Sequence, residues 1–281
     1  MGIYINTNTN SEIVQQNLSS ASSGMSTALE RLSTGYKINK AADDASGLTI
    51  SQSLTAQSNG SSDASTNAQN GINLLQTSEG DLGVIQTNLQ RVRDLAVQSA
   101  NGTNNTAERT AIQDEVQQRV DEISRLANSS SFNGISLLNG NNTSLTLQIG
   151  ANYKSGSTSL NTLTIGTGLT SATATSLGIN KVSAAFATAK SSASYIGTVD
   201  TAIAKVSTQR ATIGALQNRL TSAVSSLAVR KENIDASNAL IQDTDVASEA
   251  STLTQNQILE QTSTSLLAQA NQSANIALSL I

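Results

Sequence analysis

The sequence predicts a mainly α-helical protein: a long antiparallel, coiled-coil-like bundle formed by both chain ends, with a small central β-hairpin region. The first observation is an apolar residue at every seventh position in each end, which keeps one narrow stripe of a helix facing a partner helix. The second is a Ser/Thr/Gly-rich segment, residues 128–192, between the two repeats. The repeats comprise Val199, Val206, Ile213, Leu220, Leu227, Ile234 and Ile241 near the C-terminus, and Ala68, Leu75, Leu82, Leu89 and Ala96 near the N-terminus, with Leu54 extending that register upstream.

Three helices are predicted in the first half of the chain. Apolar residues three and four positions apart predict an amphipathic helix over Val14–Leu32, and Gly35 is typical of the position just past a helix end. After a connector, a very long helix is expected from Leu48 to about residue 100, where a cluster of turn residues ends it. The third helix has one apolar face, which consists of Ile112, Val116, Val120, Ile123 and Ala127.

The central segment changes to the period of β-strands. Asn133–Gly134 and Asn139–Gly140 are turn signals. Apolar residues alternate with Thr and Gln over residues 145–149, which predicts a half-buried strand, and residues 160–165 offer a partner strand. Helical periodicity returns around Ser183 and continues to Ile281, with breaks expected near Gly197 and at residues 243–245.

Composition excludes many kinds of chemistry. The 281 residues include no Cys, His, Trp or Pro, so common zinc sites, a thiol nucleophile and a Ser-His catalytic pair are impossible. We therefore expect no enzyme and no cofactor. The absence of Pro suits long uninterrupted helices, because an interior Pro costs ~3 kcal/mol.

Charge and hydropathy also limit the partners. The net charge of −4 and a pI of about 4.9 argue against nucleic acid or an anionic membrane surface as the main partner. No stretch approaches the ~18 consecutive apolar residues of a membrane span. The first ten residues lack the basic start and apolar run of a secretory signal peptide, so export is expected to use another route.

Few residues are candidates for a chemical site. Asp43 and Asp44 are adjacent in the connector, and without a His partner we interpret them as a capping or salt-bridging loop before the second helix. Gly166–Gly168 lacks the Gly-Lys-Ser/Thr sequence and βαβ context of a phosphate-binding loop. The Ser/Thr-rich segment suits either O-linked glycans or solvent-facing strands and loops, and both readings stay open.

The outermost helices are the strongest candidates for contacts between molecules. Each is short and lies beyond a connector, and an isolated helix of that length is marginal in water. The inner heptad repeats, in contrast, are expected to pack within one chain. The residues predicted to mediate polymerisation are Val14, Leu18, Met25, Leu29, Leu32, Leu259, Leu266, Ala270 and Ile281.

Several segments resemble bacterial flagellin. The similarity includes the start at Ile5, the segments Ala28–Asn39 and Ala42–Gly47, the signature-like Leu89–Asn101, and three shorter motifs in the right order. These motifs are Phe132–Ile135, Leu216–Leu220 and Leu267–Gln272, so that the resemblance extends over about 200 residues at both ends. Many flagellins insert large outer domains in the middle, whereas this chain resembles the minimal form without them.

The resemblance implies a division of the chain and a function. Residues 1–45 and 243–281 would form the inner tube of a filament, and residues 46–190 and 191–242 would form the outer-tube domain with its hairpin. The chain would be the subunit of the bacterial flagellar filament, secreted unfolded through the flagellar type III apparatus and extracellular. Its partners would be itself, an export chaperone, and the cap and hook-junction proteins.

The resemblance also implies recognition by host Toll-like receptor 5. The residues that match the family's receptor site are Arg91, Leu95 and Glu115, with Asp94 where some relatives have Glu. Lining a subunit contact is the alternative role of these residues. For the whole protein, the alternative is a secreted adhesin or effector with a helical stalk, which would be monomeric and would lose little on truncation of both ends.

Overall fold

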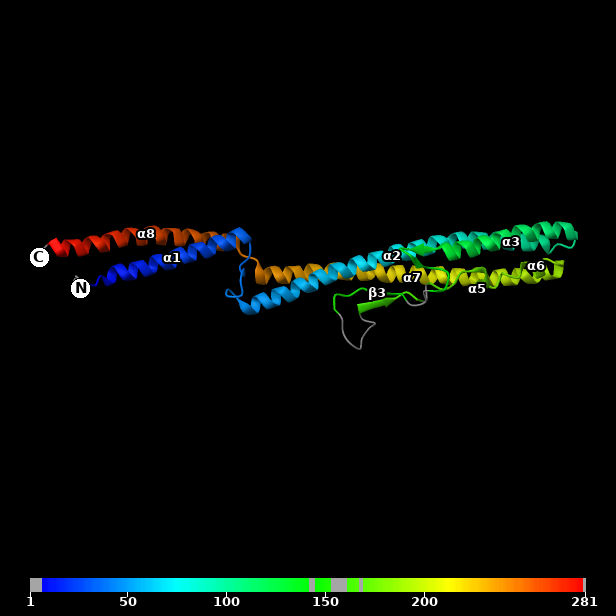
Figure 1. The fold of residues 1–281 in the computed structure, drawn as a ribbon, viewed down its shortest axis with the longest axis horizontal. Coiled ribbons are helices and arrows are strands. Elements are labelled where there is room, and N and C mark those ends of the chain that lie inside the picture. The colour runs from blue at the N-terminus through cyan, green and yellow to red at the C-terminus, as the bar shows by residue number, and fades with distance from the viewer. Residues whose placement is uncertain (1–6, 142–144, 153–160, 167–168, 280–281) are drawn as a thin grey trace. The chain divides into compact units, whose positions relative to one another are not determined.

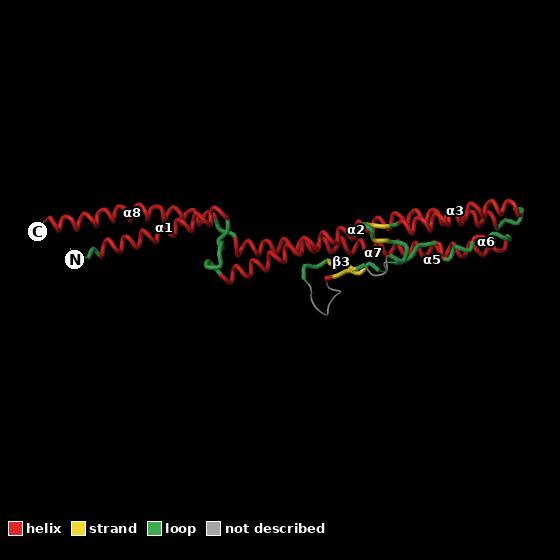
Figure 2. Tube along the Cα trace, viewed as in Figure 1, coloured by secondary structure: helices red, strands yellow, loops and turns green. Residues whose placement is uncertain are grey.

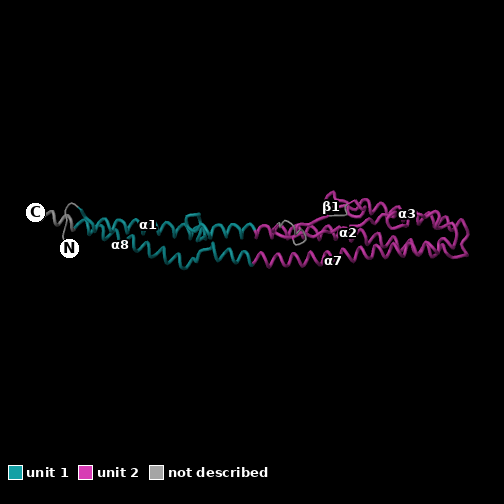
Figure 3. The backbone as a smooth tube through the Cα atoms, turned by 90° about the horizontal axis from the view of Figure 1, so that it is seen from below, with its two compact units in different colours: residues 1–56, 233–281 teal, residues 57–232 magenta. Residues whose placement is uncertain are grey.

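The computed structural model describes residues 7–141, 145–152, 161–166 and 169–279, with side chains at the C-terminal end described as far as residue 272. The chain divides into two compact units (Figures 1 and 3). Unit 1 comprises residues 1–56 and 233–281, and unit 2 comprises residues 57–232. Both are dominated by helices, and the mainly α-helical class predicted from the sequence is confirmed. Over the described residues, no helix combines the length and apolar character needed to cross a membrane.

Two helices, α1 (Thr9–Thr34) and α8 (Val246–Ser279), form most of unit 1. They run antiparallel, because Asn8 at the start of α1 donates to the carbonyl of Ala270 (3.1 Å), while Arg31 near its end lies 3.7 Å from Glu249. The Asn8 side chain also accepts a hydrogen bond from the Ser11 N–H and caps α1. Gly35 has φ of 76° and ends the helix in the left-handed conformation, as the sequence predicted.

The connectors of unit 1 are joined by backbone hydrogen bonds. The Lys37 N–H donates to the Gln242 carbonyl (2.7 Å), and the Thr244 N–H donates to the Gly35 carbonyl (2.9 Å). Asp43 accepts from two backbone N–H groups of its own loop, which lowers the pKa of its carboxyl group. Asp44 accepts from the Gly47 N–H (2.9 Å) at the start of the next helix. The interpretation of this acidic pair as a capping loop is confirmed.

The core of unit 2 is built on α2 (Ala45–Ser99), α3 (Thr106–Ser129) and α7 (Ala189–Gln242). The heptad stripe of α2 from Ala68 to Ala96 is fully buried, as is that of α7 from Val199 to Leu220. The predicted intramolecular packing of these stripes is therefore confirmed. The break expected near Gly197 is wrong, since α7 continues through it. A helix-interior Gly costs only ~1 kcal/mol relative to Ala, and buried Tyr195 and Val199 hold the helix on both sides.

Short strands and helices complete unit 2 (Figure 2). Strand β1 (Ser131–Phe132) pairs with β2 (Ile135–Ser136) across Asn133 and Gly134, whose φ angles are 48° and 77°. Strand β3 (Thr146–Gln148) pairs antiparallel with β4 (Thr162–Thr164), with Leu147 opposite Leu163. The predicted hairpin is thus confirmed over its described residues. Helices α5 (Ala174–Leu177) and α6 (Val182–Ala185) follow and contact α3.

Candidate assembly and recognition surfaces

The seam between α1 and α8 contains both apolar and polar side chains. On α1 the residues facing α8 follow a heptad pattern and include fully or mostly buried Ala21 and Ala28. The partly or fully buried positions of α8 include Leu253, Asn256, Glu260, Ser263, Leu267 and Ala270. An asparagine lies opposite Gly24, where a Cβ atom would be 2.8 Å from the side-chain nitrogen of Asn256. The helices therefore approach closely, but their seam buries little apolar surface.

Several large apolar side chains of α8 point away from α1, whereas Leu253 and Leu267 are partly buried. Ile258 is 59% exposed, Leu259 is 46% exposed and Leu266 is 53% exposed. On α1, Ile13 and Leu29 are likewise about half exposed. A shallow groove of about 340 Å³ between the two helices is lined by Ile13, Val14, Leu266 and Ala270, among others. Exposed apolar side chains gathered in this way are typical of an interaction surface.

The residues predicted for polymerisation fall into two groups. Val14, Leu18, Met25, Leu32 and Ala270 are half-buried along the α1–α8 seam. Leu29, Leu259 and Leu266 face outward, and Ile281 lies outside the described residues. The sequence-based prediction missed Ile13 and Ile258. Each is adjacent to a predicted residue but lies outside the apolar stripe on which the prediction was based. An amphipathic stripe indicates which side of a helix is apolar, and it does not distinguish an intramolecular seam from an open face.

The residues predicted for receptor recognition do not share one environment. The Nε and Nη2 atoms of Arg91 both donate to one carboxylate oxygen of Glu115, at 3.0 Å each, and both side chains are exposed. Asp94 is also exposed on α2. Leu95, in contrast, is only 2% exposed and belongs to the core of unit 2. In this conformation Leu95 has no surface for a partner and supports the helix beneath the Arg91–Glu115 pair.

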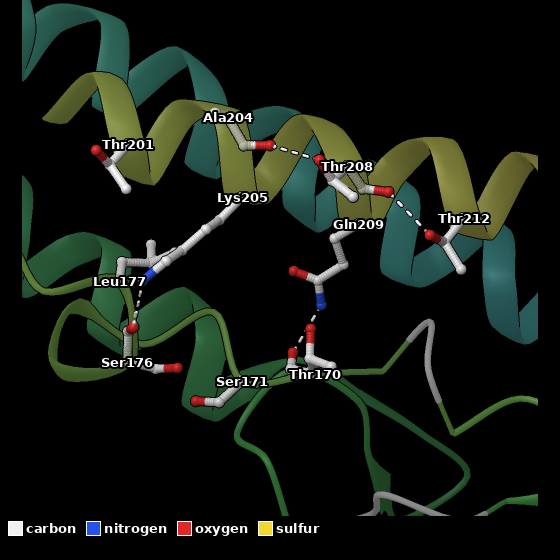
Figure 4. A pocket seen from close by; sticks show the side chains of 10 residues that line it. All are labelled: Thr170, Ser171, Ser176, Leu177, Thr201, Ala204, Lys205, Thr208, Gln209 and Thr212. Atoms are coloured by element: carbon white, nitrogen blue, oxygen red, sulfur yellow. Dashed lines mark hydrogen bonds between the residues drawn. The ribbon is translucent and has the colours of Figure 1, made fainter.

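A third surface is a cleft of about 530 Å³ between α7 and the segment around α5 (Figure 4). We call it the Lys205 cleft, because Lys205 is the only charged residue among the described residues that line it. The Lys205 ammonium group donates to the Ser176 carbonyl (3.3 Å), and the Gln209 amide donates to the Thr170 carbonyl (2.6 Å). Three threonine hydroxyls of α7 also line it and donate to their own helix backbone at 2.9 to 3.0 Å. Their oxygens are therefore left as acceptors facing the cleft.

These features define a class of protein: a helical structural protein whose terminal helices expose apolar side chains to a partner. Comparison with known families identifies it further. The bacterial flagellin N-terminal helical region matches residues 5–143, and the bacterial flagellin C-terminal helical region matches residues 196–281. The chain therefore belongs to the bacterial flagellin family, as its sequence motifs suggested.

Individual relatives agree over the full chain. Flagellin FlaB1 of Treponema pallidum (strain Nichols) is 37% identical, with 99% of this chain and 100% of that protein covered. The flagellar filament 33 kDa core protein of Treponema phagedenis is 40% identical, with the same coverage. A putative flagellar hook-associated protein from Vibrio parahaemolyticus has a similar fold, with a TM-score of 0.59 at 16% identity over 71% of this chain and 99% of that one.

The predicted function is confirmed at the level of the family. The chain is a structural subunit of the bacterial flagellar filament and functions outside the cell. The family is one of structural proteins, and the chain is short, as in the minimal form that lacks large outer domains.

Proposed function

We propose that the chain polymerises through the outward faces of α1 and α8. The single observation that supports this is the orientation of α8, which leaves Ile258, Leu259 and Leu266 about half exposed instead of buried against α1. Burying these side chains against neighbouring subunits would contribute ~25 cal/mol per Å² of apolar surface. In this proposal residues 1–45 and 243–281 form the inner tube of the filament. Residues 46–190 and 191–242 form its outer-tube domain.

Substitution of outward-facing leucines tests the proposal more sharply than truncation alone. Leu259→Gln and Leu266→Gln should raise the concentration needed for filament growth, while the melting temperature of unit 2 stays unchanged. The matched control is Gln261→Ala, at an exposed position of the same helix, and it should assemble normally. Removal of both terminal segments should abolish assembly. Filaments that grow normally from the leucine variants, seen by electron microscopy, would contradict the proposed interface.

Export and capping are the second part of the proposal. Before export, the subunit is bound by an export chaperone. It then passes unfolded through the flagellar type III apparatus. Cap and hook-junction proteins position it in the growing filament. Support comes from the composition: the chain has no Cys and therefore no disulfide to prevent threading. The exposed apolar face of α8 suits a chaperone that covers it before export. Co-purification of the candidate chaperone with wild-type chain, and its loss with Leu266→Gln, tests this step.

Recognition by host Toll-like receptor 5 is a second candidate function. The observation that favours it is the exposed Arg91–Glu115 pair, since Arg at the centre of an interface is a frequent hot spot. Arg91 can redirect its planar donors to a receptor carbonyl or carboxylate. Leu95 would then act by supporting the helix from within the core. A receptor-reporter assay on purified monomer tests this function.

A further inference from the structure

Unit 2 separates charge between two of its helices. Helix α3 carries five carboxylates and three arginines. Residues 189–232 of α7 carry six basic and two acidic side chains. Two ion pairs join α7 to α2, namely Arg93 with Asp200 (2.6 Å) and Arg210 with Glu79 (3.7 Å). Among the described residues, none joins α7 to α3.

Lys205 is one of the basic residues of α7 that have no ion pair in the described part of the chain. Its ammonium group contacts only a neutral carbonyl, and no carboxylate lies within 4.0 Å of it among the residues that the structure describes. It stands in a cleft large enough to receive a side chain from outside, between Thr201 and Thr208 of the same helix. A carboxylate entering this cleft would find one cation, Lys205, because the threonine hydroxyls donate to their own helix and have no further proton to offer it.

The acidic helix offers matching groups. Asp114, Gln118 and Asp121 lie on one exposed face of α3, which we call the acidic stripe. Asp114 has no ion pair within the described part of the chain, and Asp121 accepts one hydrogen bond, from the Gln117 amide (2.9 Å). The spacing of the acidic stripe, four residues and then three, is also the spacing of Thr201, Lys205 and Thr208.

Within the described part of one chain, no ion pair joins the acidic stripe to Lys205. Helix α2 lies between α3 and α7 in the view of Figure 3. Both α3 and α7 begin at the same end of unit 2, because a short turn joins α2 to α3 while Ser99 of α2 hydrogen-bonds Ser192 of α7 (3.0 Å). The two helices therefore run in the same direction. In two copies that point the same way, α3 of one copy would also be parallel to α7 of the other.

We propose that the Lys205 cleft receives the acidic stripe of a second copy of this chain. In a parallel arrangement, Gln118 lies opposite Lys205, and Asp114 and Asp121 flank the ammonium group at about 6 Å and about 4.5 Å along the helix, respectively. The contact joins two different patches, so it repeats from copy to copy, and it builds an open filament when the rotation between copies does not close a ring. This inference rests on the proposed function that the chain polymerises, and it assigns a lateral contact to unit 2.

The test uses the full-length chain and charge reversal. Lys205→Glu should raise the critical concentration for filament growth about tenfold or more, because it places like charges in contact. Asp114→Lys combined with Asp121→Lys should do the same. Each of these proteins should remain monomeric alone, whereas an equimolar mixture should co-assemble, because every contact between unlike copies then joins opposite charges. A chain with all three substitutions should also assemble.

The control is Lys190→Glu, which changes the charge of an exposed lysine on the same helix outside the cleft and should assemble as wild type does. Circular dichroism melts establish that every variant keeps its fold. Normal assembly of Lys205→Glu overturns the inference, and so does failure of both the mixture and the triple variant to assemble. Failure of wild-type protein to assemble would instead contradict the proposed function, which the terminal truncations test separately.

Discussion

Leu147 of β3 occupies the space that a Cβ atom on Gly71 of α2 would need. Gly71 is buried, and its missing side chain lets the hairpin lie directly on the long helix. Gly71→Ala should therefore lower the free energy of unfolding of unit 2 by about 1 to 2 kcal/mol. Overpacking of this kind costs ~1–3 kcal/mol, which exceeds the gain in helix propensity.

Gly80→Ala is the matched control for that substitution. Gly80 belongs to the same helix, and nothing lies within 4 Å of the Cβ position there. Only the helix propensity changes, so Gly80→Ala should stabilise the protein by ~0.5–1 kcal/mol. Urea denaturation followed by circular dichroism measures both variants. Equal stabilisation by the two substitutions would show that the contact with Leu147 carries no cost.

Leu147→Ala should change the shape of the filament more than its export. A curved filament needs two packing states of one sequence. We place that adjustment in the predicted hairpin of residues 144–165, of which residues 144 and 153–160 lie outside the described part, and in the subunit contacts of the long helices. Packed interfaces tend to switch between discrete states. Secretion assays and electron microscopy of the filaments compare the two effects. Variants that block secretion but leave filament shape untouched would refute this assignment.

The sequence predicted the helices of this protein well because their stripes are regular and uninterrupted. The heptads from Ala68 to Ala96 and from Val199 to Leu220 are buried as expected. A seven-residue period specifies which side of a helix packs, and that information is local. The turn at Gly35 and the cap at Asp44 were also predictable, since each depends on one residue type at one position.

What could not be predicted depends on the partner of each side chain. Leu95 matches a motif for an exposed site, yet it is buried, because α2 packs on more than one side. Ile258 and Leu259 are adjacent in sequence, and only the position of α1 decides that both face outward. The Lys205 cleft forms from segments more than twenty residues apart in sequence, so no local sequence pattern predicts it.

Hydrogen exchange should separate the two units in the monomer. Residues 1–45 and 243–281 should exchange rapidly in the free monomer and become protected in the filament. The physical reason is the seam between α1 and α8, whose fully buried apolar residues in the described part of the chain are the small Ala21 and Ala28. Their burial is too small to offset the ordering of two long helices. The heptad stripes of α2 and α7 should remain protected in both forms. Strong protection of both terminal segments in the monomer would contradict this prediction.

Tyr195 should make unit 2 sensitive to alkaline pH. The side chain is 5% exposed, and its hydroxyl donates to the Ile179 carbonyl (2.6 Å). Burial raises the pKa of Tyr195 well above its ordinary value. The unfolded chain therefore loses this proton first as the pH rises past about 10. Stability that is fully present below that pH is then lost progressively as the pH rises further.

Tyr195→Phe should remove the loss of stability that Tyr195 causes at alkaline pH. At pH 8 this variant should be less stable than wild type by ~1 kcal/mol, because the Ile179 carbonyl loses its donor. Between about pH 10 and about pH 11.5, the difference in the free energy of unfolding between wild type and Tyr195→Phe should decrease. Tyr36→Phe, at an exposed position, controls for other groups that titrate in the same range. Parallel stability curves for wild type and Tyr195→Phe, measured by urea denaturation, would contradict the assignment.

Arg91→Ala should weaken both receptor signalling and filament assembly. The exposed Arg91–Glu115 pair would face a neighbouring subunit in the filament and be free in shed monomer. Monomer should therefore activate Toll-like receptor 5 far better than intact filament, and each central contact is worth ~2 kcal/mol or more. Arg93→Ala is the matched control, since Arg93 is also exposed but pairs with Asp200 of α7. It should signal nearly as wild type does.

Leu95→Ala tests whether Leu95 supports the helix beneath the receptor site or contacts the receptor directly. Leu95 is buried, so its truncation should lower the stability of unit 2 by ~2–5 kcal/mol and weaken signalling only as far as the fold is lost. Melting temperature and a receptor-reporter assay are measured on the same protein samples. If Arg91→Ala monomer signals as strongly as wild type, the receptor site is wrongly assigned. If Leu95→Ala loses signalling while its stability is unchanged, Leu95 contacts the receptor directly, and the conformation described here is not the one that binds.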